Sequence, residues 1–311
     1  MSSQIVYCGV DVSKLTLDAF CLGHCCHQPN DSQGWRKMIA WLKRLAPNAA
    51  VVAEATGGYE RASIAAFRKA GHSTHVVPPL RVRQFASSMG RFAKTDKIDA
   101  QVIADFAQAS VPKENAPLDD LHQRLVSLVT FRDQIKLKIV ALQNQTKLSA
   151  DPLVQASAKR LLHAYQKELK TVAKAIDTLL AQSDDLALKL KKLTAFQGVG
   201  QTTALALLAY LPELGQASKQ QIAALVGVAP YNHDSGQSKG KRSIHGGRAN
   251  VRKSLYMASL TASTRNPVLS KFYQLKRSQG KPPKVALTAV MRKLLVALNL
   301  SLKNPNFSLV S

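Results

Sequence analysis

Acidic residues are scarce in this sequence, and none occurs beyond Asp234. The 311 residues hold 19 Asp and Glu against 43 Lys and Arg, which gives a formal net charge of +24. A solvated surface normally mixes charges of both signs, and repulsion on this scale needs a polyanion to offset it. The sequence therefore indicates a nucleic acid as the partner, because the phosphate backbone attracts clustered Lys and Arg. Since the basic residues do not gather on one amphipathic helix, we expect no membrane partner.

Long apolar runs and a leader segment are also missing. No run of apolar residues reaches the length of a bilayer, and residues 1–10 lack a basic region followed by an apolar one. A hydrophobic fraction of 46% is ordinary for a folded protein, and 311 residues can hold more than one core. We therefore expect a folded cytoplasmic protein.

Cysteine is rare, and the four residues lie close together at Cys8, Cys21, Cys25 and Cys26. Without a leader they are expected to be free thiols rather than a disulfide framework. Neighbouring histidines make a Cys/His tract, but zinc sites usually join two ligand pairs across a loop, and no second pair follows. Small residues in a β-hairpin explain the tract better than a metal site.

The basic charge is concentrated in the last part of the chain. Residues 1–110 hold 13 Lys and Arg against 8 acids, and residues 111–190 hold 12 against 9. Residues 191–311 hold 18 against 2. The strongest attraction for phosphate is therefore expected there.

Residues 1–112 alternate between strand and helix patterns. Apolar alternation predicts strands over 4–12 and 14–22, and short apolar runs predict buried strands over 49–53 and 73–77. Helices are predicted over the ranges 32–46, 59–70 and 97–110. This order indicates an α/β domain built on a mixed sheet.

Residues 113–190 carry apolar side chains at helical spacing, interrupted near Asp151 and Pro152. This pattern predicts an antiparallel helical hairpin, a coiled coil that pairs with another copy of the chain. Two helices packed together within one monomer fit the pattern equally well.

Residues 191–311 are predicted to form a mainly helical domain. A helix, a turn with Gly198 and Gly200, and a second helix come first, in a helix-hairpin-helix arrangement. Short helices follow on both sides of a loop over 235–250 that is rich in Gly, Ser, Lys and Arg. The whole chain is thus predicted to be α/β followed by all-α.

Four carboxylates lie at the ends of predicted elements in the first domain. Asp11 is near the end of the first strand, Glu54 ends a buried strand, and Asp96 and Asp99 open a helix on one face. Divalent cations prefer such oxygen ligands, and phosphoryl transfer uses them. Strand ends and helix caps would explain single acids, but the four together favour a metal site.

Three nearby acids, Asp18, Glu60 and Asp105, are interpreted as surface residues.

A second candidate site lies in the basic loop. Ser235 stands between Asp234 and Gly236, where a hydroxyl could attack a phosphodiester while the following cations neutralise charge. These cations are Lys239, Lys241 and Arg242. From the residues alone, a Ser-Gly pair in a polar loop is more often an ordinary turn.

Further phosphate contacts are predicted in the helical domain. The turn of Gly198 and Gly200 would offer backbone N–H groups at a helix start. Arg248, Arg252 and Lys253 would form the basic face of a helix lying on a phosphate backbone, since no acid balances them.

Several motifs, in order along the chain, resemble the DEDD transposases of bacterial insertion sequences (the one-ten family) and the related Piv-type DNA invertases. The motifs are Gly9-Val-Asp11-Val-Ser-Lys, Ala53-Glu54-Ala-Thr-Gly57, Lys94-Thr-Asp96-Lys-Ile-Asp99-Ala, Gly198-Val-Gly200, Ala229-Pro230 with Ser235-Gly236, and Gly246-Gly247-Arg248 leading to Leu255-Tyr256-Met257-Ala258. The resemblance covers nearly the whole chain.

This resemblance implies a RuvC-like, RNase H-type first domain that binds magnesium, for which manganese can substitute. Its ligands would be Asp11, Glu54, Asp96 and Asp99. It implies that Ser235 links covalently to double-stranded DNA at the element ends and target. It also implies homotetramers and a bridge RNA that pairs with the DNA.

Three hypotheses remain open. A recombinase would use Ser235 and the metal site together, whereas a metal-only nuclease of the Holliday-junction type would let water attack. A non-catalytic nucleic-acid-binding protein would use the acids only as helix caps and strand ends.

Overall fold

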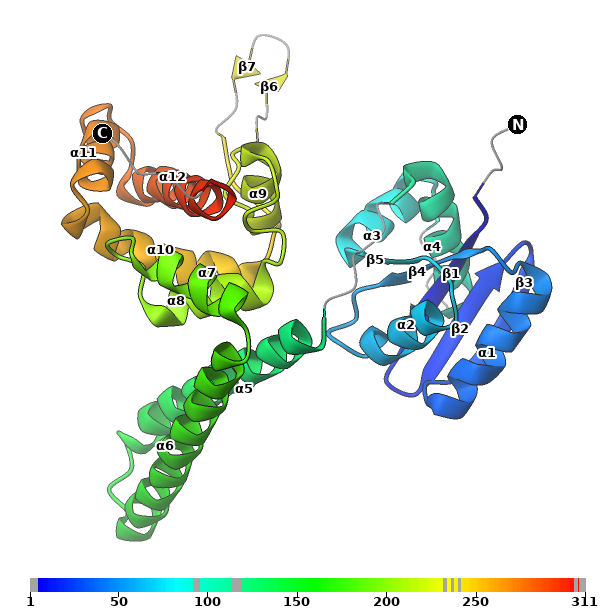
Figure 1. The fold of residues 1–311 in the computed structure, drawn as a ribbon, viewed down its shortest axis with the longest axis horizontal. Helices are drawn as coiled ribbons and strands as arrows, with labels where there is room; N and C mark the ends of the chain where they lie inside the picture. The colour runs from blue at the N-terminus through cyan, green and yellow to red at the C-terminus, as the bar shows by residue number, and fades with distance from the viewer. Residues whose placement is uncertain are drawn as a thin grey trace. The chain divides into compact units, whose positions relative to one another are not determined.

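The computed structural model describes residues 5–91, 96–112, 119–231, 234–235, 238–239, 242–304 and 307, and for 96–98, 234–235 and 238–239 it describes the backbone alone. Packing divides the chain into two compact units, Met1–Pro117 and Leu118–Ser311 (Figure 1). Each unit is described by itself below.

The first unit alternates strands and helices. Its elements are β1 (Tyr7–Val12), β2 (Thr16–Cys21), β3 (His24–Pro29), α1 (Ser32–Leu45), β4 (Ala50–Glu54), α2 (Glu60–Lys69), β5 (Thr74–Val77), α3 (Pro79–Ser88) and α4 (Asp96–Ser110). The strands form one sheet in the order β3-β2-β1-β4-β5. β2 is antiparallel to both β1 and β3, whereas β4 is parallel to β1 and to β5. The predicted mixed sheet is confirmed.

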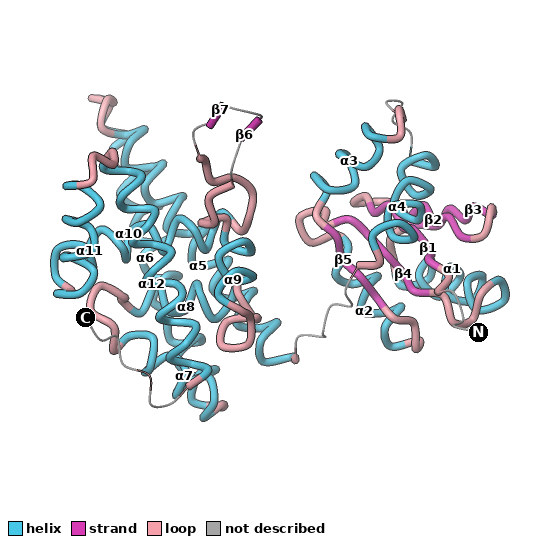
Figure 2. The backbone as a smooth tube through the Cα atoms, turned by 90° about the horizontal axis from the view of Figure 1, so that it is seen from above, coloured by secondary structure: helices cyan, strands magenta, loops and turns pink. Residues whose placement is uncertain are grey.

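Helices cover both faces of this sheet (Figure 2). The even-numbered residues of β1, such as Val10, pack in a core with α1 and α2 that includes Met38 and Phe67. Tyr7 of β1 faces the other way and packs in a core with α3 and α4 that includes Val82 and Phe106. Because side chains alternate along a strand, Tyr7, Gly9 and Asp11 share the face of α4.

The Cys/His tract lies in the hairpin of β2 and β3, as predicted, and the four thiols of β1, β2 and β3 are free, also as predicted. One element of the first unit, helix α3, was not predicted, because a Pro-Pro pair indicates the end of the preceding strand. Pro79 instead occupies the first turn of α3, where the missing N–H costs no hydrogen bond.

The second unit is mainly helical. Its elements are α5 (Asp120–Thr146), α6 (Pro152–Ala181), α7 (Asp184–Thr194), α8 (Gln201–Tyr210), α9 (Lys219–Val226), β6 (Asp234–Ser235), β7 (Ser238–Lys239), α10 (Ala249–Arg265), α11 (Pro267–Ser278) and α12 (Pro283–Lys303). The predicted helical hairpin is confirmed as α5 and α6, which Asp151 separates by capping the start of α6. The base of this hairpin shares one core with α8, where Leu125 and Val129 join Leu207.

The helices after the basic loop are longer than expected. α10 has 17 residues and α12 has 21, rather than the short segments predicted. α12 is also the one helix, among the described residues, that is long and apolar enough to cross a membrane. The sequence interpretation missed it because polar residues interrupt its apolar run. Since 56% of that apolar window is buried, and Val290, Leu294 and Leu298 lie in the core, we interpret α12 as a core helix.

Candidate active site

Gly9 lets helix α4 lie directly on strand β1. A Cβ atom at Gly9 would lie 2.1 Å from the carbonyl oxygen of Ala100 and 2.5 Å from the backbone nitrogen of Ala104. Both atoms belong to the helix backbone and cannot turn away as a flexible side chain could. The absence of a side chain at Gly9 therefore sets the distance between β1 and the first turns of α4.

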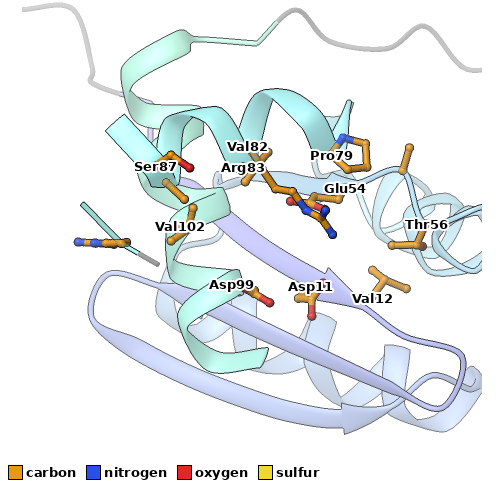
Figure 3. A pocket seen from close by; sticks show the side chains of 13 residues that line it. Asp11, Val12, Glu54, Thr56, Pro79, Val82, Arg83, Ser87, Asp99 and Val102 are labelled. Carbon is orange, nitrogen blue, oxygen red and sulfur yellow. The ribbon is translucent and has the colours of Figure 1, made fainter. Parts of the chain in front are cut away.

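Three of the four predicted carboxylates line one pocket as a result (Figure 3). Asp11 comes from β1, Glu54 from the end of β4, and Asp99 from the first turn of α4. The pocket has a volume of about 550 Å³. Figure 3 shows Asp11 and Asp99 beside each other with Glu54 farther along the pocket. The three acids thus line one pocket, and their predicted role as metal ligands remains a prediction.

Basic side chains share this pocket with the acids. Arg83 and Arg91 are among its lining residues, and Figure 3 shows the Arg83 guanidinium extending toward Glu54. Arg91 donates to Asp105 with an Nη1–Oδ2 distance of 2.7 Å. A pocket with both charges can hold a phosphate group and a cation at once.

The donor chemistry of the pocket suits a hard divalent cation, because carboxylate oxygens are its preferred ligands. The described side chains include no group of three His, Cys, Asp or Glu residues arranged to hold a metal ion. Asp96, the fourth predicted ligand, begins α4, but its side chain lies outside the described ones. The carboxylates of Asp11, Glu54 and Asp99 are thus the right type of ligand for such an ion. To bind one ion together, they would have to move closer to one another.

Asp18 is buried rather than on the surface, contrary to the prediction. It is 7% exposed and lies directly opposite Asp11 in the β1–β2 ladder. His27 of β3 lies 2.8 Å away, measured from Nδ1 to Oδ1 of Asp18. Alternation along the strand is the signal that could have found it, because Asp18 falls on the face of α4.

Glu60 is also buried, and the prediction of a surface residue was wrong. Its Oε2 accepts hydrogen bonds from Thr56 N (3.1 Å), Thr56 Oγ1 (3.0 Å) and Gly58 N (2.9 Å). These bonds close the turn that follows Glu54. Glu60 therefore positions the end of β4, and only a structure could reveal it because its partners are mostly backbone groups.

The predicted nucleophile lies on a small β-hairpin of the second unit. In it Ser235 pairs with Ser238, and Asp234 pairs with Lys239. Gly236, Gln237 and Lys241 and the side chains of Asp234, Ser235 and Lys239 lie outside the described residues and side chains, so the geometry around the hydroxyl remains untested.

The base of the serine hairpin is described. Tyr231 pairs with Ser243 across it, and the Tyr231 ring stacks on His245 with centroids 4.3 Å apart.

Arg248 joins the end of this loop to α8 and the turn after it. Its guanidinium forms a two-pronged ion pair with Glu213, with Nη1–Oε2 at 2.5 Å and Nη2–Oε1 at 2.7 Å, and also donates to Tyr210 O. Burial alone would raise the pKa of Glu213, but the hydrogen bonds and charge of Arg248 outweigh it, so the pKa lies below its usual value.

The remaining predicted phosphate contacts fall into two groups. Arg252 donates to the carbonyl oxygens of Val226 and Gly246, so it, like Arg248, has partners within the chain. Arg242 and Lys253 are exposed. Contact of these four side chains with DNA remains a prediction.

The Gly198 and Gly200 turn connects α7 to α8 as predicted. Gly198 has a φ of +100°, and a Cβ there would lie 2.7 Å from the Ala262 nitrogen, so packing against α10 requires it. Gly200 precedes α8, whose first N–H groups receive no side-chain cap. Packing against α10 therefore explains Gly198. The turn at Gly200 is the part that leaves backbone N–H groups at the start of α8 for a ligand.

Comparison with known proteins gives consistent similarities over the chain. Residues 8–149 match a DEDD transposase model of the IS110 family, described as a transposase, and residues 190–274 match a model described as the transposase IS116/IS110/IS902 family. The chain is 27% identical over 301 residues to the pilin gene-inverting protein of Moraxella lacunata, and 27% identical to that of Moraxella bovis. In both cases 93% of each chain is covered.

Replacing Gly9 with alanine tests the contact between β1 and α4. We predict that Gly9→Ala lowers the free energy of unfolding of the first unit by about 3 kcal/mol, because the new Cβ must displace helix backbone. Denaturant unfolding of the full chain, followed by a probe in the first unit, measures this. Gly200→Ala is the matched control, since a Cβ there meets no atom within 4 Å. Equal stability of the two variants would show that α4 does not approach β1 as described.

The pair of Glu213 and Arg248 can be tested by charge reversal. We predict that Arg248→Glu speeds amide hydrogen exchange at Tyr231, at the base of the serine hairpin, about tenfold, as expected when a charge-assisted bond is lost. The double variant Glu213→Arg with Arg248→Glu should restore protection against exchange. An unchanged exchange rate in Arg248→Glu would contradict the proposed role of the pair in holding the hairpin base.

The same pair predicts a pH dependence. Because the folded pKa of Glu213 is lowered, the pair stabilises the fold above the usual glutamate pKa, and this contribution is lost as the pH falls through the folded value. Glu213→Gln should abolish that part of the acid sensitivity, which unfolding of the parent protein and the variant across acidic pH would measure.

Proposed function

Because this chain belongs to the IS110 family of DEDD transposases and is related to the pilin gene-inverting proteins, we propose that it cuts and rejoins DNA at the ends of an insertion sequence. The family makes it a transposase or recombinase acting on DNA. The observation that carries the proposal is the single pocket lined by Asp11, Glu54 and Asp99. The strand order of the sheet is consistent with the RuvC-like, RNase H-type fold that the resemblance implies.

The DEDD family implies a divalent metal ion, and we propose that it is magnesium, for which manganese can substitute. Asp11, Glu54, Asp96 and Asp99 would be its ligands. When bound, the ion would stabilise negative charge on the oxygens of the scissile phosphate. The carboxylates would have to approach one another, which mutual repulsion opposes in the metal-free protein.

The proposed nucleophile is Ser235. Its Oγ attacks the phosphorus of a phosphodiester, forming a phosphoserine bond to one DNA end while the displaced sugar oxygen takes up a proton and leaves as a hydroxyl. Attack by a hydroxyl of the partner strand breaks the phosphoserine bond and restores the serine. Lys239, Lys241 and Arg242 would neutralise the charge that develops.

Phosphate contacts in the helical unit are proposed at two places. The start of α8 after Gly200 offers uncapped N–H groups, and Lys253 extends the positive charge along α10. Arg248 and Arg252 are proposed to contribute chiefly by holding the base of the serine hairpin, with DNA contact as a second role.

We also propose that the α5–α6 hairpin pairs with other copies of the chain. Large apolar side chains are exposed along it, such as Leu137 (58%), Leu148 (94%) and Leu153 (72%). An apolar surface on a two-helix projection is typical of a coiled-coil contact, and a homotetramer would cover it. A bridge RNA is the proposed second nucleic acid, supported by the net charge of +24, and the cytoplasm is the proposed location.

Changing a pocket carboxylate should separate binding from chemistry. We predict that Asp11→Asn lowers the rate of DNA cleavage by at least about a hundredfold, because losing even an outer-shell partner of a metal site costs 10–100-fold. Affinity for DNA should remain within about twofold. Chelation should stop cleavage by the parent protein, and magnesium or manganese should restore it.

Cleavage assays and DNA-binding titrations measure both properties. Asp185→Asn is the control, since this exposed acid of α7 pairs with Lys189 and is not among the residues that line the pocket. If Asp11→Asn cleaved at the parent rate, the pocket would not be catalytic.

The role of Ser235 can be tested by trapping. We predict that the parent protein forms a covalent adduct with DNA carrying the element end, that Ser235→Ala forms none, and that Ser238→Ala, changed on the paired strand, still does. Peptide mapping by mass spectrometry should find phosphoserine at position 235.

Two arms of the same experiment address the partners. Adduct formation with and without RNA transcribed from the element tests the bridge RNA, and sedimentation of the trapped complex counts its chains. Continued cleavage by Ser235→Ala would favour a metal-only nuclease instead.

A further inference from the structure

Helices α11 and α12 and the turn between them carry cations that the proposed chemistry does not use. We call this set the α11–α12 basic surface and define it as Lys271, Lys276, Arg277, Lys281, Lys284 and Lys293. Four of these residues are exposed, whereas Lys276 and Lys293 are half-buried. The two helices follow one another in the chain and lie side by side (Figures 1 and 2).

One aromatic ring brings cations of both helices together. The Lys276 Nζ lies 5.4 Å from the centroid of the Phe272 ring, and the Lys293 Nζ lies 4.7 Å from it. The attraction of each ammonium group for the ring partly offsets their mutual repulsion. This contact brings one cation of α11 and one of α12 together at the same ring.

No carboxylate balances these charges among the described residues. Some cations elsewhere have acidic partners, as Lys189 has Asp185 and Arg248 has Glu213. On the basic surface, Lys276 instead donates a hydrogen bond to the side-chain oxygen of Gln279, and Arg277 donates one to the Lys281 carbonyl oxygen. Both acceptors are neutral. Like charges kept together without acids are typical of a surface that meets a polyanion.

We propose that the α11–α12 basic surface binds the phosphate backbone of duplex DNA, as a contact separate from the serine hairpin. This inference rests on the proposed function for the identity of the DNA. The matched family region ends at residue 274, so five of the six defining cations lie beyond it and Lys271 lies within it. The surface would hold DNA flanking the cleaved position rather than the reacting phosphate.

An anionic membrane is the competing polyanion, and the packing of α12 argues against it. Its apolar residues, including Leu287, Val290 and Leu294, are buried in the core of the unit and are not available to enter a bilayer. Among the described residues of α11 and α12, Leu275 and Val285 are the large apolar side chains that are exposed. A surface that is mainly positive and only slightly apolar suits phosphates in water.

The test is the salt dependence of DNA binding by the full chain without divalent metal, so that no cleavage occurs. The variant changes Lys276, Arg277, Lys281 and Lys284 to Gln. If all four contact phosphates, the slope of log Kd against log salt should fall by about 3 to 4, since each contact contributes about 0.9. The affinity should fall at least about tenfold at low salt.

A matched control removes the same charge elsewhere. It changes four exposed lysines of α6 to Gln, namely Lys159, Lys167, Lys170 and Lys174. Its slope should change by less than about 1. Equal losses in both variants would overturn the proposal, because net charge alone would then explain the binding.

Two further arms keep the result unambiguous. A variant that changes only Arg277, Lys281 and Lys284 leaves both Phe272 contacts in place, so its slope change cannot come from loss of the fold. Vesicles of anionic phospholipid test the membrane, and loss of vesicle binding with unchanged DNA binding would overturn the proposal. Since no adduct is measured, failure of the Ser235 chemistry would leave the slope result readable.

Discussion

The contact between Gly9 and the backbone of α4 determines where the acids of the first unit lie. A helix this close to the central strand brings the first turn of α4, with Asp99, beside Asp11, which shares the face of Gly9. The parallel neighbour β4 then places Glu54 at the same end of the sheet. Three acids from distant parts of the sequence line one pocket because one side chain is missing.

The second unit has the opposite electrostatic problem. Between Ala195 and the end of the chain the only acids are Glu213 and Asp234, so nearly every cation must be stabilised in another way. Arg248 forms an ion pair with Glu213, and Arg252 donates hydrogen bonds to backbone carbonyls. The Phe272 ring makes cation–π contacts with two lysines. These contacts keep cations at fixed positions, which lowers the entropy that a bound phosphate would otherwise cost.

Sequence patterns predicted most elements, because apolar periodicity reports which face of a strand or helix is buried. They missed α3, since Pro79 reads as a terminator although it fits the first helical turn. They also misplaced Asp18 and Glu60, because the burial of a polar residue depends on partners that only the fold supplies. The same limit applies to Arg248, whose partner Glu213 is 35 residues away. The carboxylate pocket was predictable because Asp11 and Glu54 lie near the ends of the parallel strands β1 and β4, and Asp99 lies in the first turn of a helix.

The acid cluster on the α4 face and the basic second unit carry local charge of opposite sign, which one kind of substrate can offset. Asp11, with Asp18 directly opposite it and Asp99 beside it, concentrates negative charge on the α4 face, which a divalent cation would offset. The second unit concentrates positive charge, which phosphates would offset. A phosphodiester that carries a metal ion supplies both. Residues 1–110 are basic as a whole, with 13 Lys and Arg against 8 acids, so the acids on the α4 face form a local cluster. A substrate that bears both a cation and phosphates would account for this cluster and for the basic second unit together.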